Sequence, residues 1–180
     1  MVTWIVGLAG SGKTTLGTAL VARLRAAGRP VVLLDGDAVR AVFGDDLGHA
    51  LEDRRANGRR IAALSGLLEE QGIEVVACVL AIDPDQLAAN RATFGRYLEV
   101  FLDVPWAVLE ARDQKGLYSG ARSGRIRDVV GIDIPFSAPV APDLVLGRPG
   151  PTGAIDGPEA LEGWVDRIMD RLPGPQLVGR

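Results

Sequence analysis

Residues 7–14 constrain the fold of this chain more than any other segment. They read GLAGSGKT and match the pattern G-x-x-x-x-G-K-[ST] at every position. An apolar run over 2–6 precedes the motif, and a helical pattern over 13–27 follows it. Glycines allow the backbone to turn its N–H groups toward phosphates, and the N-terminus of the next helix adds the positive end of its dipole. The motif therefore predicts a strand, a phosphate-binding loop and a helix, in that order.

The residue types in this loop also predict its ligand. Lys13 is expected to reach the β- and γ-phosphates of ATP, and the Thr14 hydroxyl is expected to ligate Mg²⁺. The backbone around the phosphates would come from Gly7, Ala9, Gly10, Ser11 and Gly12. The alternative is a glycine-rich turn without a ligand, which the complete match and its position between strand and helix disfavour.

Short apolar runs alternate with amphipathic stretches along the rest of the chain. Besides the strand at 2–6, strands are predicted at 31–34, 74–79, 97–102 and 143–146. Besides the helix at 13–27, helices are predicted at 54–71, 84–95, 105–112 and 158–172. This alternation is typical of βα units around a parallel sheet whose strands are buried on both faces. We predict an α/β fold with a central parallel β-sheet in a three-layer sandwich, formed by one domain over 1–172 with a tail at 173–180.

The segment 113–139 differs in character from the segments on either side. Its apolar periodicity is weak, its glycines recur, and Lys115, Arg122, Arg125 and Arg127 give it local positive charge. We interpret it as a lid and not as an element of the core.

Composition excludes several classes of partner. The formal net charge of −3 argues against the basic surface that nucleic-acid binding requires. No apolar run approaches the roughly 20 residues of a membrane span, and the first residues lack the basic start of a signal peptide. We therefore expect a cytoplasmic protein without nucleic-acid or membrane partners. The single cysteine, Cys78, lies in an apolar run and is expected to be a buried thiol.

Two carboxylates follow the second predicted strand, in the sequence LLDGD over 33–37. Ligands bind at the carboxyl edge of an open α/β sheet, so Asp35 and Asp37 are expected to face them. We assign Asp37 as the base that accepts the proton of an attacking hydroxyl, and Asp35 as the group on the metal side. The alternative is a turn in which an aspartate only caps a helix.

Several basic and amide side chains are candidates for holding a phosphorylated acceptor. Arg40 follows the aspartates, and Arg54 and Asn57 lie within one turn of a predicted helix. A planar guanidinium suits the oxygens of an anion. Solvated surface arginines are the alternative, chiefly for Arg55 and Arg59.

The order of these segments resembles the adenylylsulfate kinase family over roughly 3–146. The matching pieces are GLAGSGKTT, LLDGDAVR, DLG followed by DRRANGRR, FLDVP, EARDQKGLYSGAR, GID and APDLVL. The resemblance implies a P-loop kinase fold that transfers the γ-phosphate of ATP to the ribose 3′-hydroxyl of adenosine 5′-phosphosulfate. It also implies that the ATP site includes Thr15, and Arg112 near the base. It implies that the acceptor lies against Arg40, Arg54 and Asn57. Residues 115–122, which include Lys115, are implied to form a lid over both ligands.

This chain departs from the family pattern on the acceptor side. His49 and Val129 occupy the two positions at which the family has phenylalanines around the acceptor adenine. Ile82 is followed by the stretch Asp-Pro-Asp-Gln, which begins at Asp83 and stands where the family has Ser-Pro-Tyr-Arg. We include all four residues in the expected acceptor site. An alternative acceptor therefore stays open, such as a modified cytidine diphosphate or a smaller alcohol.

Two other functional classes use the same phosphate-binding loop. A P-loop ATPase would use water as its acceptor, and a regulatory nucleotide-binding module would bind without transfer. The chain lacks an evident base-reading N-K-x-D motif, and the pair Asp35 and Asp37 favours transfer to an alcohol over binding alone. Related kinases commonly form dimers, so a homodimer is possible.

Overall fold

The structure is a computed structural model that describes residues 1–80, 83–113, 116–148 and 158–174. Its sheet has five parallel strands in the order β2-β3-β1-β4-β5. The strands are β1 (Val2–Gly7), β2 (Val31–Asp35), β3 (Glu74–Leu80), β4 (Tyr97–Leu102) and β5 (Leu144–Leu146). All five predicted strands are therefore present, each within one residue of its predicted ends.

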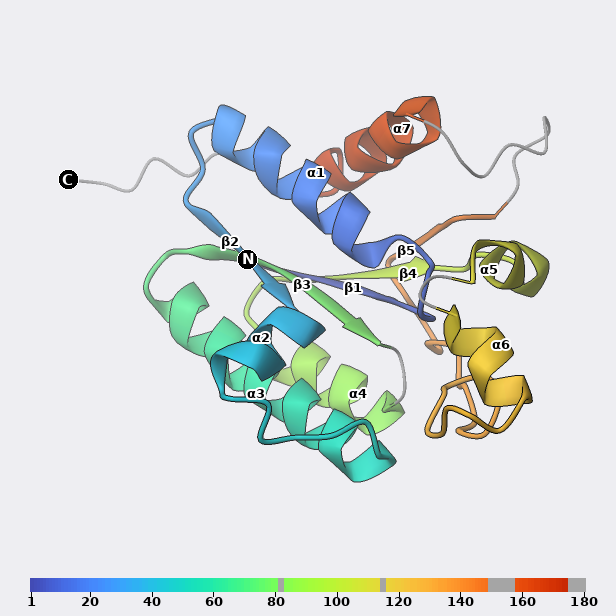
Figure 1. The fold of residues 1–180 in the computed structure, drawn as a ribbon. Helices are drawn as coiled ribbons and strands as arrows, with labels where there is room; N and C mark the ends of the chain where they lie inside the picture. The colour runs from blue at the N-terminus through green and yellow to red at the C-terminus, as the bar shows by residue number, and fades with distance from the viewer. Residues whose placement is uncertain (81–82, 114–115, 149–157, 175–180) are drawn as a thin grey trace.

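Helices cover both faces of this sheet (Figure 1). They are α1 (Lys13–Ala26), α2 (Gly36–Val42), α3 (Leu51–Glu70), α4 (Pro84–Thr93), α5 (Trp106–Arg112), α6 (Leu117–Arg122) and α7 (Pro158–Met169). The first and last of these lie side by side on one face, whereas α2, α3 and α4 lie on the other. The predicted three-layer α/β sandwich with a central parallel sheet is confirmed.

The central strand β1 shows why the sheet is buried on both faces. Successive side chains of a strand point to opposite sides. Ile5 accordingly joins the core cluster under α1 and α7, while Trp4 and Val6 join the cluster under α3 and α4. Trp4 is 1 % exposed, and every residue of β1 is buried. The continuous apolar run of β1 is thus what burial on two faces requires.

Two helices escaped the sequence prediction because each is only about two turns or shorter. Helix α2 begins at a glycine and has seven residues, and α6 has six. Neither is long enough to display a clear helical period of apolar residues. Helix α3 begins three residues before its predicted start at 54.

The segment 113–139 contributes more to the core than predicted. Tyr118, Val129, Val130 and Ile134 are buried and form a third apolar cluster with Leu8 of the phosphate loop. Part of this segment therefore packs into the core, which its weak periodicity did not indicate. Its apolar residues are spaced irregularly along a loop and one short helix, so no sequence period indicated their burial. The interpretation of 113–139 as a lid stays a prediction.

Within the described residues, no helix combines the length and the hydrophobicity that a bilayer span needs.

Candidate active site

The phosphate loop joins β1 to α1 at the carboxyl edge of the sheet (Figure 1). Gly10 and Gly12 have φ values of 74° and 94°, a backbone conformation that glycine adopts without a steric penalty. A Cβ on Gly7 would lie 2.9 Å from the carbonyl oxygen of Leu102, so this position also excludes any larger residue. The glycines of the motif are thus required by the path of the backbone.

Lys13 lies inside this loop and donates its Nζ proton to the carbonyl oxygen of Leu8 at 2.8 Å. Burial lowers its pKa from 10.5 to about 8, although Asp35 and Asp37 oppose the shift. An anion within reach of Nζ would stabilise the charged form. The amine is therefore suited to a phosphate ligand.

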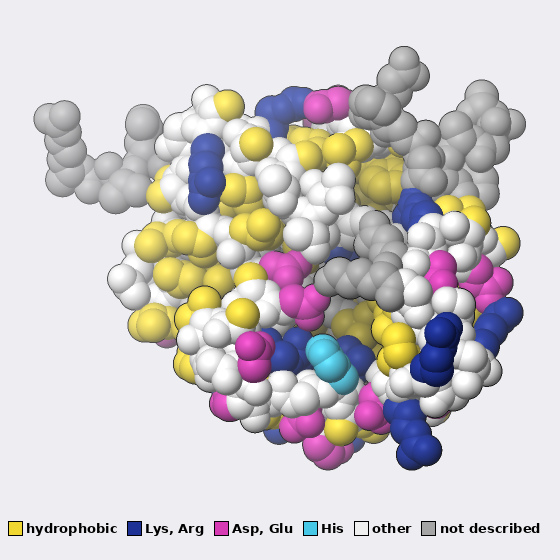
Figure 2. Space-filling view, viewed as in Figure 1, with side chains coloured by type: hydrophobic (Ala, Val, Ile, Leu, Met, Phe, Trp, Pro, Cys, Tyr) yellow, Lys and Arg dark blue, Asp and Glu magenta, His cyan; other side chains and the backbone are white. Residues whose placement is uncertain are grey.

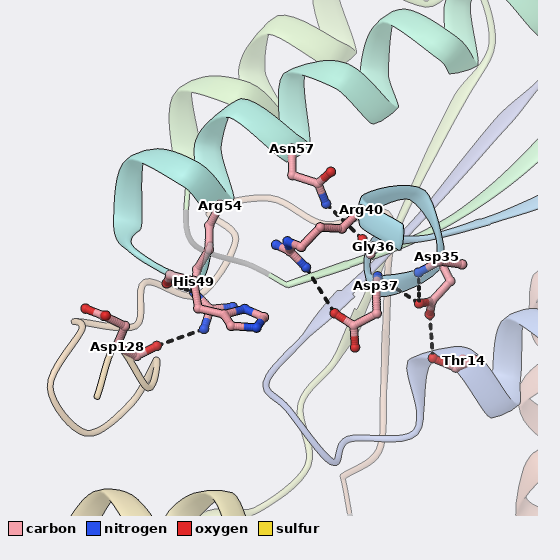
Figure 3. A network of polar contacts seen from close by, with 10 residues as sticks. Thr14, Asp35, Gly36, Asp37, Arg40, His49, Arg54, Asn57 and Asp128 are labelled. Atoms are coloured by element: carbon pink, nitrogen blue, oxygen red, sulfur yellow. Dashed lines mark hydrogen bonds and ion pairs between the residues drawn. The ribbon is translucent and has the colours of Figure 1, made fainter. Parts of the chain in front are cut away.

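Asp35 connects the phosphate loop to the acceptor side (Figure 3). One carboxylate oxygen accepts the hydroxyl proton of Thr14 at 2.7 Å, and the other accepts the backbone N–H groups of Asp37 at 3.0 Å and Ala38 at 3.4 Å. Asp35 is therefore the N-cap of α2, as the structural alternative predicted. The same geometry turns its second oxygen toward Thr14, so capping and a role beside the loop are compatible.

The oxygens of Thr14 and Asp35 fit a Mg²⁺ ion. Magnesium prefers oxygen ligands, and in ATP-dependent enzymes it uses one or two protein groups together with the phosphates. Among the residues that the structure describes, no group of three or more His, Cys, Asp or Glu side chains could hold a metal ion. The oxygens of Thr14 and Asp35, 2.7 Å apart, could hold Mg²⁺ together with the phosphates of ATP.

Asp37 points away from the sheet into solvent, with 81 % of its side chain exposed. Its Oδ1 lies 3.2 Å from Nη1 of Arg40. The carboxylate is therefore held on one side and open on the other, which a general base for an incoming hydroxyl requires.

Arg40 and Asn57 are buried at this edge, with exposures of 7 % and 4 %. Asn57 donates Nδ2 to the carbonyl oxygen of Gly36 at 2.9 Å, but its Oδ1 has no partner among the described residues. Nε of Arg40 is likewise without a partner in the described chain. Buried polar atoms are normally hydrogen-bonded, so these two invite a polar ligand.

Arg54 brings two distant segments together at the rim of the site (Figure 3). It donates Nε to the carbonyl oxygen of His49 at 2.6 Å and Nη2 to that of Asp128 at 2.8 Å. Val129, the next residue, is 2 % exposed. Arg54 thereby joins the segment of His49 to the segment just before Val129, and the role of these two positions at the acceptor stays a prediction.

The single histidine, His49, lies at the edge of a hollow that has basic side chains within it (Figure 2). Partial burial lowers the pKa of its imidazole, and the nearby charges of Arg54 and Arg40 lower it further. His49 is therefore mainly neutral near pH 7 and can accept or donate a hydrogen bond.

Asp83 lines a small pocket together with Arg54 and Gly58. Its side chain is 17 % exposed and does not cap α4, and Nε of Arg55 lies 3.8 Å from its Oδ2. Arg55 itself pairs with Glu52 at 2.7 Å on the surface. Two predicted acceptor residues, Ile82 and Lys115, lie outside the described residues.

Two side-chain contacts with the phosphate loop were not predicted from the sequence. Arg112, expected near the ATP base, donates to the carbonyl oxygen of Gly10 at 2.8 Å. Tyr118, which was not singled out, donates its hydroxyl to the carbonyl oxygen of Ala9 at 2.7 Å. Nothing in the local sequence of Tyr118 indicates a partner 109 residues away. As predicted, Cys78 is a buried thiol, and burial raises its pKa to about 12.

The model of the adenylylsulphate kinase family matches residues 1–147. The chain belongs to the adenylylsulphate kinase family. It is 45 % identical over 172 residues to the adenylyl-sulfate kinase of Paraburkholderia xenovorans, with 95 % of this chain and 92 % of that protein covered. It is 41 % identical to the chloroplastic adenylyl-sulfate kinase 1 of Arabidopsis thaliana, with 92 % and 60 % covered.

Solved structures extend the comparison to three dimensions. The Mycobacterium tuberculosis APS kinase CysC, in complex with AMPPNP and APS, superimposes on this chain with a TM-score of 0.81 at 34 % identity. The superposition covers 93 % of this chain and 96 % of the CysC chain. Shikimate kinase from Aquifex aeolicus, at 19 % identity and a TM-score of 0.54, shares the fold alone. This family member is therefore a P-loop kinase that uses ATP and Mg²⁺ to phosphorylate a hydroxyl.

Proposed function

We propose that this kinase transfers the γ-phosphate of ATP to the 3′-hydroxyl of adenosine 5′-phosphosulfate. The observation that carries the proposal is the pair of buried, incompletely hydrogen-bonded side chains, Arg40 and Asn57, beside the open carboxylate of Asp37. An acceptor with both an anionic group and a hydroxyl would satisfy all three residues. Family membership supports adenosine 5′-phosphosulfate as that acceptor.

The phosphoryl donor side consists of the loop amides and Lys13. The amides of Gly7 to Thr15 would surround the phosphates, and the Lys13 ammonium would offset charge on the β- and γ-phosphates. Mg²⁺ held by Thr14 and Asp35 would neutralise further charge on the phosphates. In the transfer, the bond from the γ-phosphorus to the β,γ-bridging oxygen breaks and a bond to the acceptor oxygen forms.

Asp37 is the proposed base for this transfer. The acceptor hydroxyl would give its proton to the Asp37 carboxylate as its oxygen bonds to the γ-phosphorus. Arg40 lies 3.2 Å from that carboxylate and would keep it oriented. The products would be ADP and the 3′-phosphorylated acceptor.

Arg54, with Arg40 and Asn57, would hold the anionic part of the acceptor. Arg54 is already fixed by the carbonyl groups of His49 and Asp128, so little side-chain entropy would be lost on binding. We place the base of the acceptor between His49 and Val129, because Arg54 joins the carbonyl groups of His49 and of Asp128, the residue before Val129. Lys115 and Ile82 would complete the acceptor site, and Arg112 would lie near the ATP base.

A second candidate acceptor is a different phosphorylated alcohol, such as a modified cytidine diphosphate. Val129 offers no aromatic face to a purine, and aromatic stacking is worth about 1–3 kcal/mol per base. The Asp83 carboxylate lines the same pocket as Arg54, so it also adds negative charge on the side where an anionic acceptor would bind. These observations favour an acceptor that needs less stacking and carries less negative charge at that end.

We further propose one domain over 1–172, with a lid formed by 113–139 and a tail at 173–180. We also propose a cytoplasmic enzyme that forms a homodimer; the net charge of −3 supports the absence of nucleic-acid partners.

An acceptor panel tests the proposal. ADP release would be followed with ATP and Mg²⁺ alone, and then with adenosine 5′-phosphosulfate or with cytidine and uridine diphosphate derivatives. We expect release that depends on adenosine 5′-phosphosulfate at micromolar concentration. A preference for a cytidine derivative would replace adenosine 5′-phosphosulfate with the second candidate acceptor. ADP release without any acceptor would indicate an ATPase.

A further inference from the structure

Three consecutive carbonyl groups of the phosphate loop each accept a hydrogen bond from a side chain. Leu8 O accepts from Lys13 at 2.8 Å, Ala9 O from Tyr118 at 2.7 Å and Gly10 O from Arg112 at 2.8 Å. Lys13 belongs to the loop motif itself, whereas the other two donors come from α5 and α6. The outer side of the loop is thus held by residues more than 100 positions away.

Tyr118 is fixed firmly enough to act as such a support. It is 3 % exposed, and its ring packs edge-on against Trp106 with centroids 5.0 Å apart. The carboxylate of Asp113 accepts the backbone N–H groups of Tyr118 at 2.8 Å and Ser119 at 3.3 Å, which anchors the first turn of α6. Burial raises the pKa of the Tyr118 phenol to about 12, so the hydroxyl remains a donor throughout the physiological range.

The bond to Ala9 O also determines the direction of an amide that faces a phosphate site. The carbonyl and the N–H of a trans peptide point in opposite directions, and the described chain contains no cis peptide. Ala9 O and the N–H of Gly10 belong to the same peptide plane. Because the Ala9 carbonyl is directed at Tyr118, the N–H of Gly10 is directed away from Tyr118.

This support is needed because the plane ends at a glycine. Gly10 has φ 74°, and a Cβ at that position would have no neighbour within 4 Å. Glycine reaches several backbone conformations at similar energy, so the plane could rotate if nothing held it. Loop amides bind phosphate only while they converge on it.

We propose that Tyr118 is a positioning residue for the nucleotide: its hydroxyl holds the Ala9–Gly10 peptide so that the Gly10 amide faces the phosphates of ATP. This role does not depend on the identity of the acceptor. Tyr118 need not touch the nucleotide, since it acts through the backbone of the loop.

The test is Tyr118→Phe, which removes the hydroxyl and keeps the ring against Trp106. Tyr97→Phe is the matched control, because Tyr97 is the chain's other tyrosine and donates its hydroxyl to Glu99 at 3.1 Å in β4, away from the loop. ADP binding would be measured by calorimetry without acceptor. We expect Tyr118→Phe to weaken ADP binding and raise the KM for ATP about three- to tenfold, the effect of one net hydrogen bond.

The kinetic pattern separates positioning from general damage. We expect kcat at saturating ATP and the KM for the acceptor to change less than about twofold in Tyr118→Phe, and Tyr97→Phe to bind ADP like the parent. Unchanged ADP binding in Tyr118→Phe would overturn the proposal, as would an equal loss in Tyr97→Phe. Because the ADP measurement omits the acceptor, it stands even if the proposed acceptor is wrong.

A second measurement avoids dependence on the folding of Tyr118→Phe. In the Tyr97→Phe chain, 3-fluorotyrosine labels position 118 alone, and its ¹⁹F resonance reports on the hydroxyl contact. We expect the resonance to shift when ADP binds without acceptor. A resonance that ignores saturating ADP would contradict the coupling between Tyr118 and the loop.

Discussion

Substituting Asn57 with leucine should separate stability from acceptor binding. In the free enzyme, the buried Oδ1 of Asn57 has no partner among the described residues, while Nδ2 donates to Gly36 O. Removing an unpaired buried acceptor gains about 1–3 kcal/mol, and losing the Gly36 bond costs about 0.5–1.5 kcal/mol. The free energy of unfolding should therefore change by between about −0.5 and +2.5 kcal/mol.

The same substitution should damage catalysis. An acceptor bound through Asn57 would lose a hydrogen bond from or to a charged group, which is worth about 1.5–3 kcal/mol. We expect kcat/KM for the acceptor to fall about 10- to 100-fold, with KM for ATP unchanged. The melting temperature should shift by between about −2 and +10 °C, because 1 kcal/mol corresponds to about 2–4 °C at this size.

Asn90→Leu provides the control for this prediction. Asn90 is 2 % exposed in α4 and also has an amide nitrogen without a partner among the described residues, but it lies outside the proposed acceptor site. Its replacement should leave acceptor kinetics intact. If Asn57→Leu lowered the melting temperature by several degrees and left the acceptor KM intact, Asn57 would be a structural residue and the reasoning would fail.

Three further outcomes follow from the site. Asp83→Ser should lower the KM for adenosine 5′-phosphosulfate at least about threefold and leave the KM for ATP unchanged, because a carboxylate that lines the same pocket as Arg54 is removed; a raised KM in steady-state assays would mean that Asp83 helps to bind the acceptor. Lys13 has a pKa of about 8, so its charged form is lost as pH rises through that value, and kcat/KM for ATP should fall at higher pH; a flat pH profile between 7 and 9 would contradict this assignment. Cys78 is 2 % exposed with a pKa of about 12, so iodoacetamide at neutral pH should leave it unmodified in the folded protein and modify it after denaturation, as mass spectrometry would show; rapid alkylation without unfolding would refute its burial.

The parts of the fold that the sequence predicts are those with local signals. The phosphate loop is a contiguous motif, and the strands are contiguous apolar runs, so both were predicted to within a residue. Helix α2 was missed because its seven residues are stabilised by the Asp35 cap and by packing on α3, not by a helical period.

The parts that the sequence does not predict depend on contacts between distant segments. Arg54 was assigned to the acceptor site, but its bond to the carbonyl oxygen of Asp128, 74 residues away, arises only when the loop after Arg127 folds back over α3. Tyr118 reaches Ala9 in the same way. Such contacts join residues with no shared pattern in the chain, so neither composition nor spacing can indicate them.

The most direct test of the proposed function follows the transferred phosphate itself. The enzyme would be incubated with adenosine 5′-phosphosulfate and ATP labelled in the γ-phosphate, and the product would be digested with a 3′-nucleotidase. The account predicts a labelled product that releases all its label in this digestion, and little product from Asp37→Asn or Lys13→Ala. Label that stays on the nucleotide after digestion, or full transfer by both variants, would contradict it.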